Sequence, residues 1–219
     1  MIDLFKKELT ENGFSFEEIT DQIISIENFL SEEELDSICK IINNTSQEEW
    51  EVEYTSNLKN FCMTKFGRDD VDNLVAEGKF EITENWKDKN FNITSHKIYQ
   101  PLFNKLNKLV ISSYKNLELS GMATIQRMQS GVELKSHTDQ HTDPSIKYAT
   151  IAYINDDYVD GILFFPKLNI EIKPKPGTLL FFPGDEDHEH GVKPVGKGPI
   201  RYVLVGFIKE KNHYKNNRY

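Results

Sequence analysis

Four of the six histidines in this chain lie in two short clusters. The first cluster contains His137 and His141, and the second contains His188 and His190. Asp139 stands between the two histidines of the first cluster. Two imidazoles and one carboxylate are the donor set of a mononuclear non-haem iron site, which leaves coordination positions open. The pattern therefore predicts an iron centre whose ligands come from two distant parts of the chain.

Two His-x-Asp pairs compete for the first half of this centre. Residues i and i+2 of a strand point to the same face, so His137 and Asp139 can present both groups to one metal. The overlapping copy 141–143 has the same spacing, but Pro144 follows it and indicates a turn. His137 and Asp139 instead end a strand that begins after Gly131. We therefore predict that the first pair provides the ligands.

The third ligand has two candidates in the second cluster. His190 could supply it from another strand across the barrel, and it stands directly before a Gly-Val-Lys-Pro-Val run. His188 lies beside the acidic segment 185–187. The two histidines share strand parity, so alternation does not separate them. Local context favours His190 and leaves His188 open.

Arg201 opens the apolar run 201–208, which predicts a buried strand. An inward guanidinium would need an anionic partner, and its planar fork suits two-point contact with a carboxylate. Alternatively, Arg201 stands at the strand edge and points into solvent. These residues alone leave both arrangements open.

Bulk composition limits the class of protein. With 219 residues, 38% of them apolar, the chain is expected to form one domain, 1–219, around one core. No segment resembles a signal peptide or a membrane span, which predicts a soluble, cytoplasmic protein without a membrane partner. The net charge of −9 argues against a nucleic-acid partner. Nothing in the sequence indicates the oligomeric state.

Residues 1–120 are expected to support the site. Periodicity predicts a helix over 1–12, a strand over 22–26, a helix opened by a capping box at Ser31 to Glu34, and a long helix over 95–115. The segment 45–92 has no sustained period. It is expected to pack as irregular covering structure or to act as a lid over the site.

After residue 120, short β-rich runs alternate with turn residues, which is typical of an antiparallel double sheet. The predicted strands are 122–129, 132–137, 147–155, 161–165, 170–173, 178–182, 189–193 and 200–208. The expected fold class is α+β, with a double-stranded β-helix (jelly roll) of about eight strands at 121–209 and supporting helices before it. Residues 210–219 are expected to be a basic tail.

Three runs carry a resemblance to a known family. The segments 161–166, 172–183 and 190–202 resemble the catalytic core of the iron(II)/2-oxoglutarate-dependent dioxygenases, in their prolyl 4-hydroxylase-like branch. The match spans 122–209, and the segment 24–34 resembles that family's first strand and helix.

The resemblance implies a role for each candidate residue. His137, Asp139 and His190 would bind iron(II), which resolves the choice between His188 and His190. Arg201 would bind the distal carboxylate of 2-oxoglutarate, and the hydroxyl of Tyr153 would contact the same group. Judged without the resemblance, Tyr153 is an ordinary core aromatic. The implied cofactors are iron(II), 2-oxoglutarate and dioxygen, with ascorbate as a reductant.

The substrate is less well determined than the reaction class. The family often has tyrosines where this chain has Met128 and Leu134, and neither replacement offers a phenol. The expected reaction is hydroxylation of an unactivated C–H bond, with release of succinate and carbon dioxide, on a peptidyl proline. Alternative substrates are a free amino acid, a small metabolite or a nucleobase. A non-catalytic jelly-roll binding module is the third class of function.

Overall fold

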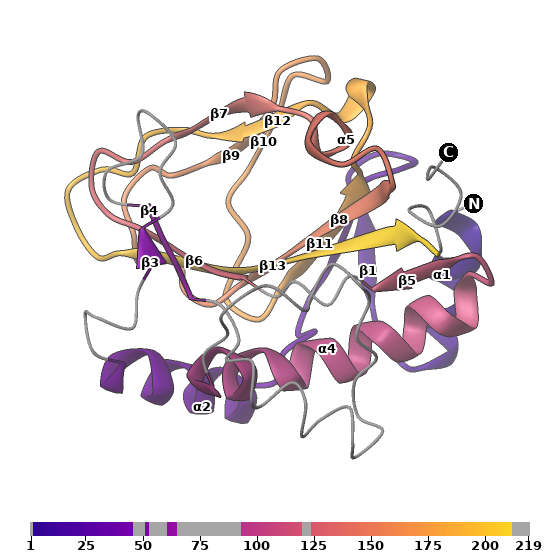
Figure 1. Cartoon of the computed structure of the whole chain (residues 1–219), viewed down its shortest axis with the longest axis horizontal. Coiled ribbons are helices and arrows are strands. Elements are labelled where there is room, and N and C mark those ends of the chain that lie inside the picture. Colours follow the sequence, from indigo (N-terminus) through magenta and orange to yellow (C-terminus); the bar gives the residue numbers. More distant parts are fainter. Residues whose placement is uncertain (1, 46–50, 53–60, 65–92, 120–123, 212–219) are drawn as a thin grey trace, which may run out of the picture.

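The computed structural model describes residues 2–45, 51–52, 61–64, 93–119 and 124–211. In this part of the chain, two antiparallel sheets face each other, and helices cover the outer face of the larger sheet (Figure 1). Most of the expected lid, 45–92, and most of the expected basic tail lie outside the described residues.

The predicted helices form within about two residues of their expected bounds. They are α1 (Ile2–Glu11), α2 (Glu32–Asn44) and α4 (Ile93–Ser113). The capping box that opens α2 is complete, because the Glu34 amide donates to Ser31 Oγ over 3.2 Å and the Ser31 amide donates to Glu34 Oε2 over 2.8 Å.

The larger sheet has the order β1-β2-β11-β8-β13-β6-β4-β3, with β5 beside β13. Its strands are β1 (Phe16–Glu18), β2 (Ile24–Ile26), β3 (Glu51–Val52), β4 (Phe61–Thr64), β5 (Leu117–Leu119), β6 (Thr124–Met128), β8 (Ile146–Tyr153), β11 (Leu179–Pro183) and β13 (Arg201–Glu210). Strands β1, β3, β4 and β5 were not predicted, and β3 and β4 lie in the segment 45–92, for which irregular structure was expected.

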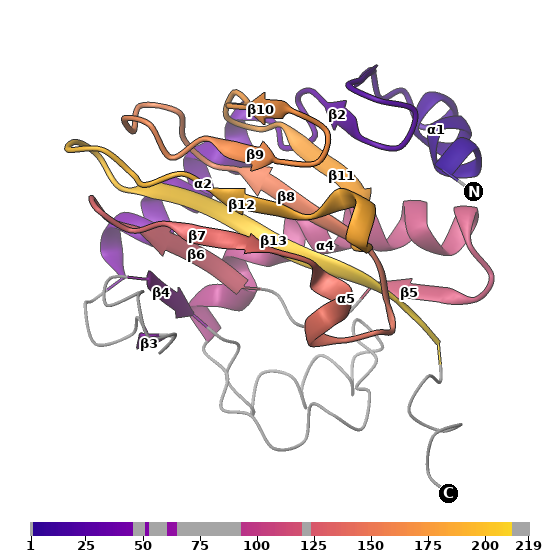
Figure 2. The ribbon, with the colours of Figure 1, turned by 90° about the horizontal axis from the view of Figure 1, so that it is seen from above.

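The smaller sheet has the order β10-β9-β12-β7. Its strands are β7 (Leu134–His137), β9 (Leu163–Phe165), β10 (Ile170–Ile172) and β12 (His190–Val192). Strands β6 to β13 therefore divide evenly between two antiparallel sheets. Seen from above in Figure 2, the strands of the smaller sheet lie over those of the larger one. The jelly roll predicted for this region is confirmed.

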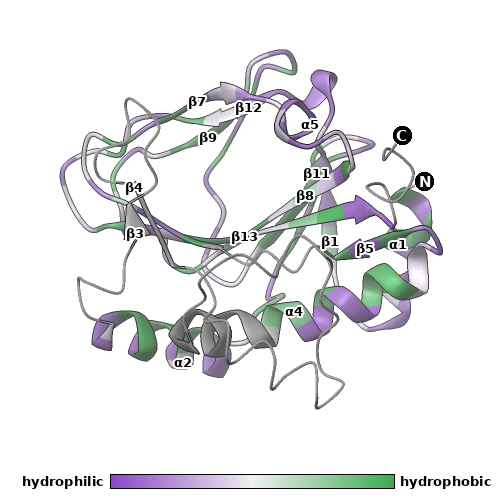
Figure 3. Ribbon diagram, in the orientation of Figure 1, coloured by the Kyte–Doolittle hydropathy of each residue, from purple (hydrophilic) through white to green (hydrophobic). Residues whose placement is uncertain are grey.

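The larger sheet buries both of its faces, and strand alternation decides which residues enter the barrel. On β13, Val203 and Val205 pack between the sheets, whereas Leu204 and Ile208 pack toward the helices. Figure 3 shows the resulting concentration of hydrophobic residues along the central strands. Arg201 has the same parity as Val203 and so belongs to the barrel side.

The helix layer packs through aromatic side chains. Phe5 of α1 stacks on Phe181 of β11 with 4.2 Å between ring centroids, and the ring centroid of Tyr148 lies 4.7 Å from that of the same Phe181.

None of the helices in the described ranges is long and apolar enough to cross a bilayer.

Candidate metal centre

His137 and His190, the two histidines favoured as metal ligands, lie on neighbouring strands. Strands β7 and β12 pair in antiparallel fashion, with His137 directly opposite His190. The expectation that His190 approaches from across the barrel is therefore wrong, because the strand order places its strand beside that of His137. Gly191 permits this close pairing, since a Cβ atom there would lie 2.6 Å from the Leu134 carbonyl oxygen.

Asp139 is not part of a strand, contrary to the sequence prediction. It is the first residue of the short helix α5 (Asp139–Thr142), with Thr138 as the N-cap residue. Thr138 keeps an extended backbone, at φ −116° and ψ 141°, so the side-chain alternation continues through it. Asp139 therefore still lies on the same side of the chain as His137.

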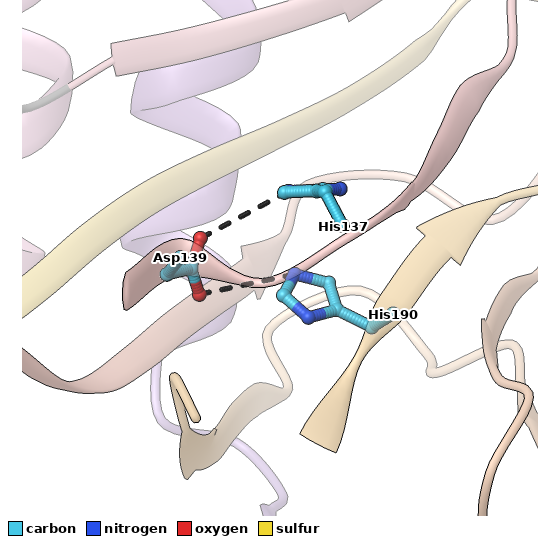
Figure 4. Close-up of side chains that lie close together, drawn as sticks. All are labelled: His137, Asp139 and His190. Atoms are coloured by element: carbon cyan, nitrogen blue, oxygen red, sulfur yellow. Dashed lines mark ion pairs between the residues drawn. The ribbon is translucent and has the colours of Figure 1, made fainter. Parts of the chain in front are cut away.

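The three side chains point toward one another (Figure 4). Asp139 Oδ1 lies 3.9 Å from His137 Nε2, and Asp139 Oδ2 lies 3.9 Å from His190 Nε2. One donor atom from each residue lies within 4.8 Å of the other two, and this group could hold a single metal ion. Within the described residues, no other set of three or more such side chains has this arrangement.

Backbone carbonyls orient both imidazoles. His137 Nδ1 lies 2.9 Å from the Lys135 carbonyl oxygen, and His190 Nδ1 lies 3.1 Å from the His188 carbonyl oxygen. A carbonyl can only accept, so each Nδ1 carries the proton and donates it. The Nε2 lone pair of each ring is thereby left for a metal.

The electrostatics of the trio suit a bound cation. Asp139 is buried, and its Oδ2 atom has no hydrogen-bond partner in the described part of the chain. Burial raises the pKa of Asp139 to about 6 against the opposing effect of His137, and burial lowers the pKa of His190 to about 3. A carboxylate with an unpaired oxygen, beside two oriented imidazoles, is a donor set that suits a divalent iron ion. The residues fit the predicted metal.

The competing histidines are placed elsewhere. His141 is exposed, and Asp143 binds the Ser145 hydroxyl at 2.6 Å and Lys209 Nζ at 2.7 Å. His188 ends the short 3₁₀ helix η3 (Glu186–His188), and its Nδ1 lies 2.6 Å from Asp185 Oδ1. Asp143 and the Nδ1 atom of His188 are thus already engaged by other side chains, and neither His141 nor His188 belongs to the group that could hold a metal.

Arg201 is fully buried, so the alternative of a solvent-exposed arginine is excluded. Its Nη2 atom donates to the hydroxyl of Tyr153 over 3.3 Å, and its Nη1 atom donates to the sulfur of Met128 over 3.2 Å. Tyr153 is also fully buried, and burial raises its pKa to about 12 although Arg201 opposes the shift. The neutral phenol and the guanidinium therefore lie together inside the barrel.

The two departures from the family pattern have different surroundings. Met128 is the register partner of Arg201 across β6 and β13, and it is fully buried. Leu134 is partly buried and packs against the core between the sheets. A thioether is a weak acceptor, so Met128 gives the Arg201 guanidinium little compensation for its charge.

Comparison with known families supports the resemblance. Residues 123–209 match the model of the 2OG-Fe(II) oxygenase superfamily. This segment belongs to that superfamily. It contains all five residues to which the resemblance assigns a role, and it coincides with the jelly roll.

Among the curated proteins similar to this chain are prolyl 3-hydroxylases. Prolyl 3-hydroxylase 1 of Gallus gallus is 29% identical over 76 residues, and human prolyl 3-hydroxylase 2 is 34% identical over 65 residues. The alignments cover 32% and 27% of this chain and 10% and 9% of those proteins. The match therefore spans about a tenth of the length of these relatives.

Solved structures share the fold over nearly the whole chain. A prolyl hydroxylase from Trichoplax adhaerens, in complex with a hypoxia inducible factor peptide fragment, has a TM-score of 0.66 at 16% identity, covering 99% of this chain and 92% of that one. A Pseudomonas putida prolyl-4-hydroxylase has a TM-score of 0.60 at 14% identity, covering 96% and 100%. These likenesses extend the fold of the oxygenase segment to its supporting helices.

Two residues of the oxygenase segment make contacts that the sequence did not predict. Asn155 joins the end of β8 to the start of β13, because its amide donates to the Ile200 carbonyl over 2.7 Å and its oxygen accepts from the Tyr202 amide over 2.9 Å. Tyr158 packs beside Arg201. Side-chain contacts between distant segments leave no periodic signal in the sequence.

Proposed function

We propose that this protein is an iron(II)- and 2-oxoglutarate-dependent hydroxylase that acts on peptidyl proline. The observation that carries the proposal is the trio of His137, Asp139 and His190, in which Asp139 and His190 are buried and the carboxylate lacks a protein donor for one oxygen. A jelly roll whose segment belongs to the 2OG-Fe(II) oxygenase superfamily surrounds this trio.

In this proposal each residue has one role. His137, Asp139 and His190 hold the iron, and the hydrogen bonds at Nδ1 keep both imidazoles in the ligating orientation. When bound, iron(II) and 2-oxoglutarate supply the activation of dioxygen, with succinate and carbon dioxide as co-products. Phe182, with its ring centroid 4.8 Å from that of His190, helps to exclude water from this side of the site.

Arg201 and Tyr153 bind the distal carboxylate of 2-oxoglutarate in this proposal. Arg201 has no ion pair with a carboxylate among the residues described here, although its side chain is fully buried. A buried guanidinium requires an anionic partner, and its planar fork fits a carboxylate. The Tyr153 hydroxyl accepts from Arg201 and keeps its own proton for the same ligand.

The choice of peptidyl proline is supported by the named functions of similar proteins. Curated relatives are prolyl 3-hydroxylases, and one similar structure holds a peptide fragment. The substrate is the part of the proposal that a direct assay addresses.

Succinate release tests the reaction and its substrate together. The purified protein is incubated with iron(II), 2-oxoglutarate and ascorbate, alone or with proline-rich peptides, free amino acids or nucleobases. Peptides are expected to stimulate succinate release and to gain one oxygen atom on proline, as measured by mass spectrometry. Stimulation by small molecules alone would favour the alternative substrate class, and no turnover in any arm would favour a binding module.

A matched pair of histidine variants tests the ligand assignment. His137→Ala should abolish peptide-stimulated succinate release, because it removes one of three metal donors. His141→Ala, at an exposed position in the competing pair, should retain the wild-type rate. Equal loss in both variants, or loss only in His141→Ala, would contradict the assignment.

Omitting ascorbate from the same assay tests its expected role as reductant. The cytoplasmic location stays a prediction.

A further inference from the structure

The buried hydroxyl of Tyr158 donates its proton to no described residue. Tyr158 lies in the connection between β8 and β9, the residue is 1% exposed, and its hydroxyl oxygen has no described partner within hydrogen-bonding geometry, although the Arg201 guanidinium, which can only donate, is near enough to act on its pKa. Burial raises the pKa of this phenol, although Arg201 opposes the shift, so the group is a neutral O–H donor at physiological pH. An unsatisfied buried hydroxyl is unusual in a native structure and points to a missing partner.

The surroundings of Tyr158 indicate what that partner is. Its ring centroid lies 5.8 Å from the central carbon of the Arg201 guanidinium, and the Tyr153 ring lies 5.3 Å from the same carbon. Gly161 makes room for this packing, because a Cβ atom there would lie 3.2 Å from both Arg201 Cδ and Tyr158 Cδ2. Both phenol rings therefore lie beside one buried cation.

Lys173 helps to fix the position of Tyr158. Lys173 Nζ donates to the Tyr158 carbonyl oxygen over 2.6 Å and lies 4.5 Å from the centre of its ring. This contact holds the backbone and covers the ring with a second positive charge. A rigid phenol at this place loses little conformational entropy when it binds a ligand.

More hydrogen-bond donors than acceptors are present in the group formed by Arg201, Tyr153 and Tyr158. Arg201 Nε has no partner within the described ranges, and Nη1 reaches only the weakly accepting sulfur of Met128. The hydroxyl protons of both tyrosines are also available. An anion with several acceptor oxygens would satisfy all of these groups, whereas a neutral ligand would leave the guanidinium charge unpaired.

We propose that the Tyr158 hydroxyl is a further donor to the distal carboxylate of 2-oxoglutarate, beside Arg201 and Tyr153. This inference rests on the proposed function, because it assigns a residue to the same co-substrate. Tyr158 then determines affinity for the co-substrate, and it has no part in holding the metal or in the later chemistry.

The test is Tyr158→Phe, which removes one oxygen atom and keeps the ring. In the manganese(II)-loaded protein, calorimetry should show the dissociation constant of 2-oxoglutarate rising about tenfold, the loss expected for one hydrogen bond to a charged group. The affinity for manganese(II) alone should equal that of the wild type. In turnover, KM for 2-oxoglutarate should rise while kcat at saturation stays unchanged.

Two further measurements separate binding from folding. Without ligands, Tyr158→Phe should melt at or above the wild-type temperature, because it removes a buried unsatisfied group. Tyr114→Phe is the matched control, since it removes another buried hydroxyl, one that lies beside Tyr148 on the helix side of the larger sheet, and it should leave 2-oxoglutarate affinity unchanged.

The possible failures are distinguishable. If the wild-type protein binds manganese(II) but not 2-oxoglutarate, the proposed function fails. If the wild type binds 2-oxoglutarate and Tyr158→Phe binds it equally well, the role of Tyr158 is wrong and the proposed function stands. Equal weakening of manganese(II) and 2-oxoglutarate binding would show a structural effect and would also overturn the inference.

Discussion

Asp139 brings a carboxylate into the barrel interior without a hydrogen-bond donor for its Oδ2 atom in the described structure. The nearest cationic candidates are the Nε2 atoms of His137 and His190, each 3.9 Å from one carboxylate oxygen. Burial of the His190 ring disfavours its protonation. In the metal-free protein, the buried Asp139 carboxylate is therefore destabilised. A bound cation would relieve this cost.

Asp139→Asn tests this property. The amide has nearly the same shape and carries no charge, so the free energy of unfolding of the metal-free protein at pH 8 should rise by about 1–3 kcal/mol. The same variant should lose manganese(II) binding, measured by calorimetry. A variant that is less stable without metal would show that Asp139 has a protein partner in solution. Asp187→Asn, at an exposed carboxylate, is the control and should change stability by less than about 0.5 kcal/mol.

The element that positions Asp139 is the short helix α5 with the turn that follows it. The Gln140 amide donates to the Gly184 carbonyl over 3.0 Å, which fixes the first turn of α5 against the end of β11. Beyond the helix, Asp143 accepts from the Ser145 amide over 2.9 Å and from Lys209 of β13 over 2.7 Å. A four-residue helix has little stability of its own, so these contacts hold it.

The Asp143 contacts predict a pH dependence of stability. Burial alone would raise the pKa of Asp143, but Lys209 and Ser145 together hold it well below its usual range. A depressed folded-state pKa gives stability that is present above the unfolded value of about 3.9 and is lost as pH falls below it. Asp143→Asn should therefore lower the free energy of unfolding by about 1–3 kcal/mol at pH 7. The difference from wild type should shrink toward pH 2.

Chemical denaturation at several pH values measures this difference. Subtracting the variant from the wild type removes the contribution of the other carboxylates. A constant difference from pH 7 to pH 2 would mean that Asp143 contributes through packing and not through its charge.

At the scale of the whole molecule, the larger sheet separates two hydrophobic clusters. One cluster lies between the sheet and the helices α1, α2 and α4, and the other lies between the two sheets. The candidate metal ligands and Arg201 lie on the same side of the larger sheet as the second cluster. The helices cover the opposite face of that sheet and support it (Figure 1). Rigid strands on both sides can hold side chains in place more precisely than loops can.

Ligand binding should consequently stabilise the fold as a whole. Manganese(II) and 2-oxoglutarate bind the folded protein, so a 2-oxoglutarate concentration 100 times its dissociation constant should add about 2.7 kcal/mol to the free energy of unfolding. For a domain of this size that corresponds to a rise in Tm of about 5–10 °C, measured by calorimetry. Asp139→Asn should show no rise. A rise of equal size in this variant would place the binding site elsewhere.

Much of this structure could be predicted from local patterns. The capping box at Ser31, the helical periods and the alternation of short β runs with turns depend on neighbouring residues, and so they appear in the sequence. The spacing of His137 and Asp139 likewise indicated a shared site, and the choice of His190 followed from the run after it. By itself, the sequence determined the jelly roll, the donor types and the class of chemistry.

Tertiary structure decided how these parts meet. Strand order placed His190 beside His137 rather than across the barrel, and the contacts of α5 placed Asp139 on a helix rather than a strand. Parity within β13 turned Arg201 inward, where it met Tyr153 and Tyr158. These outcomes depend on pairing between distant segments, whose energies come from contacts that no local pattern records. The sequence thus identified the chemical groups, and packing determined which of them share one site.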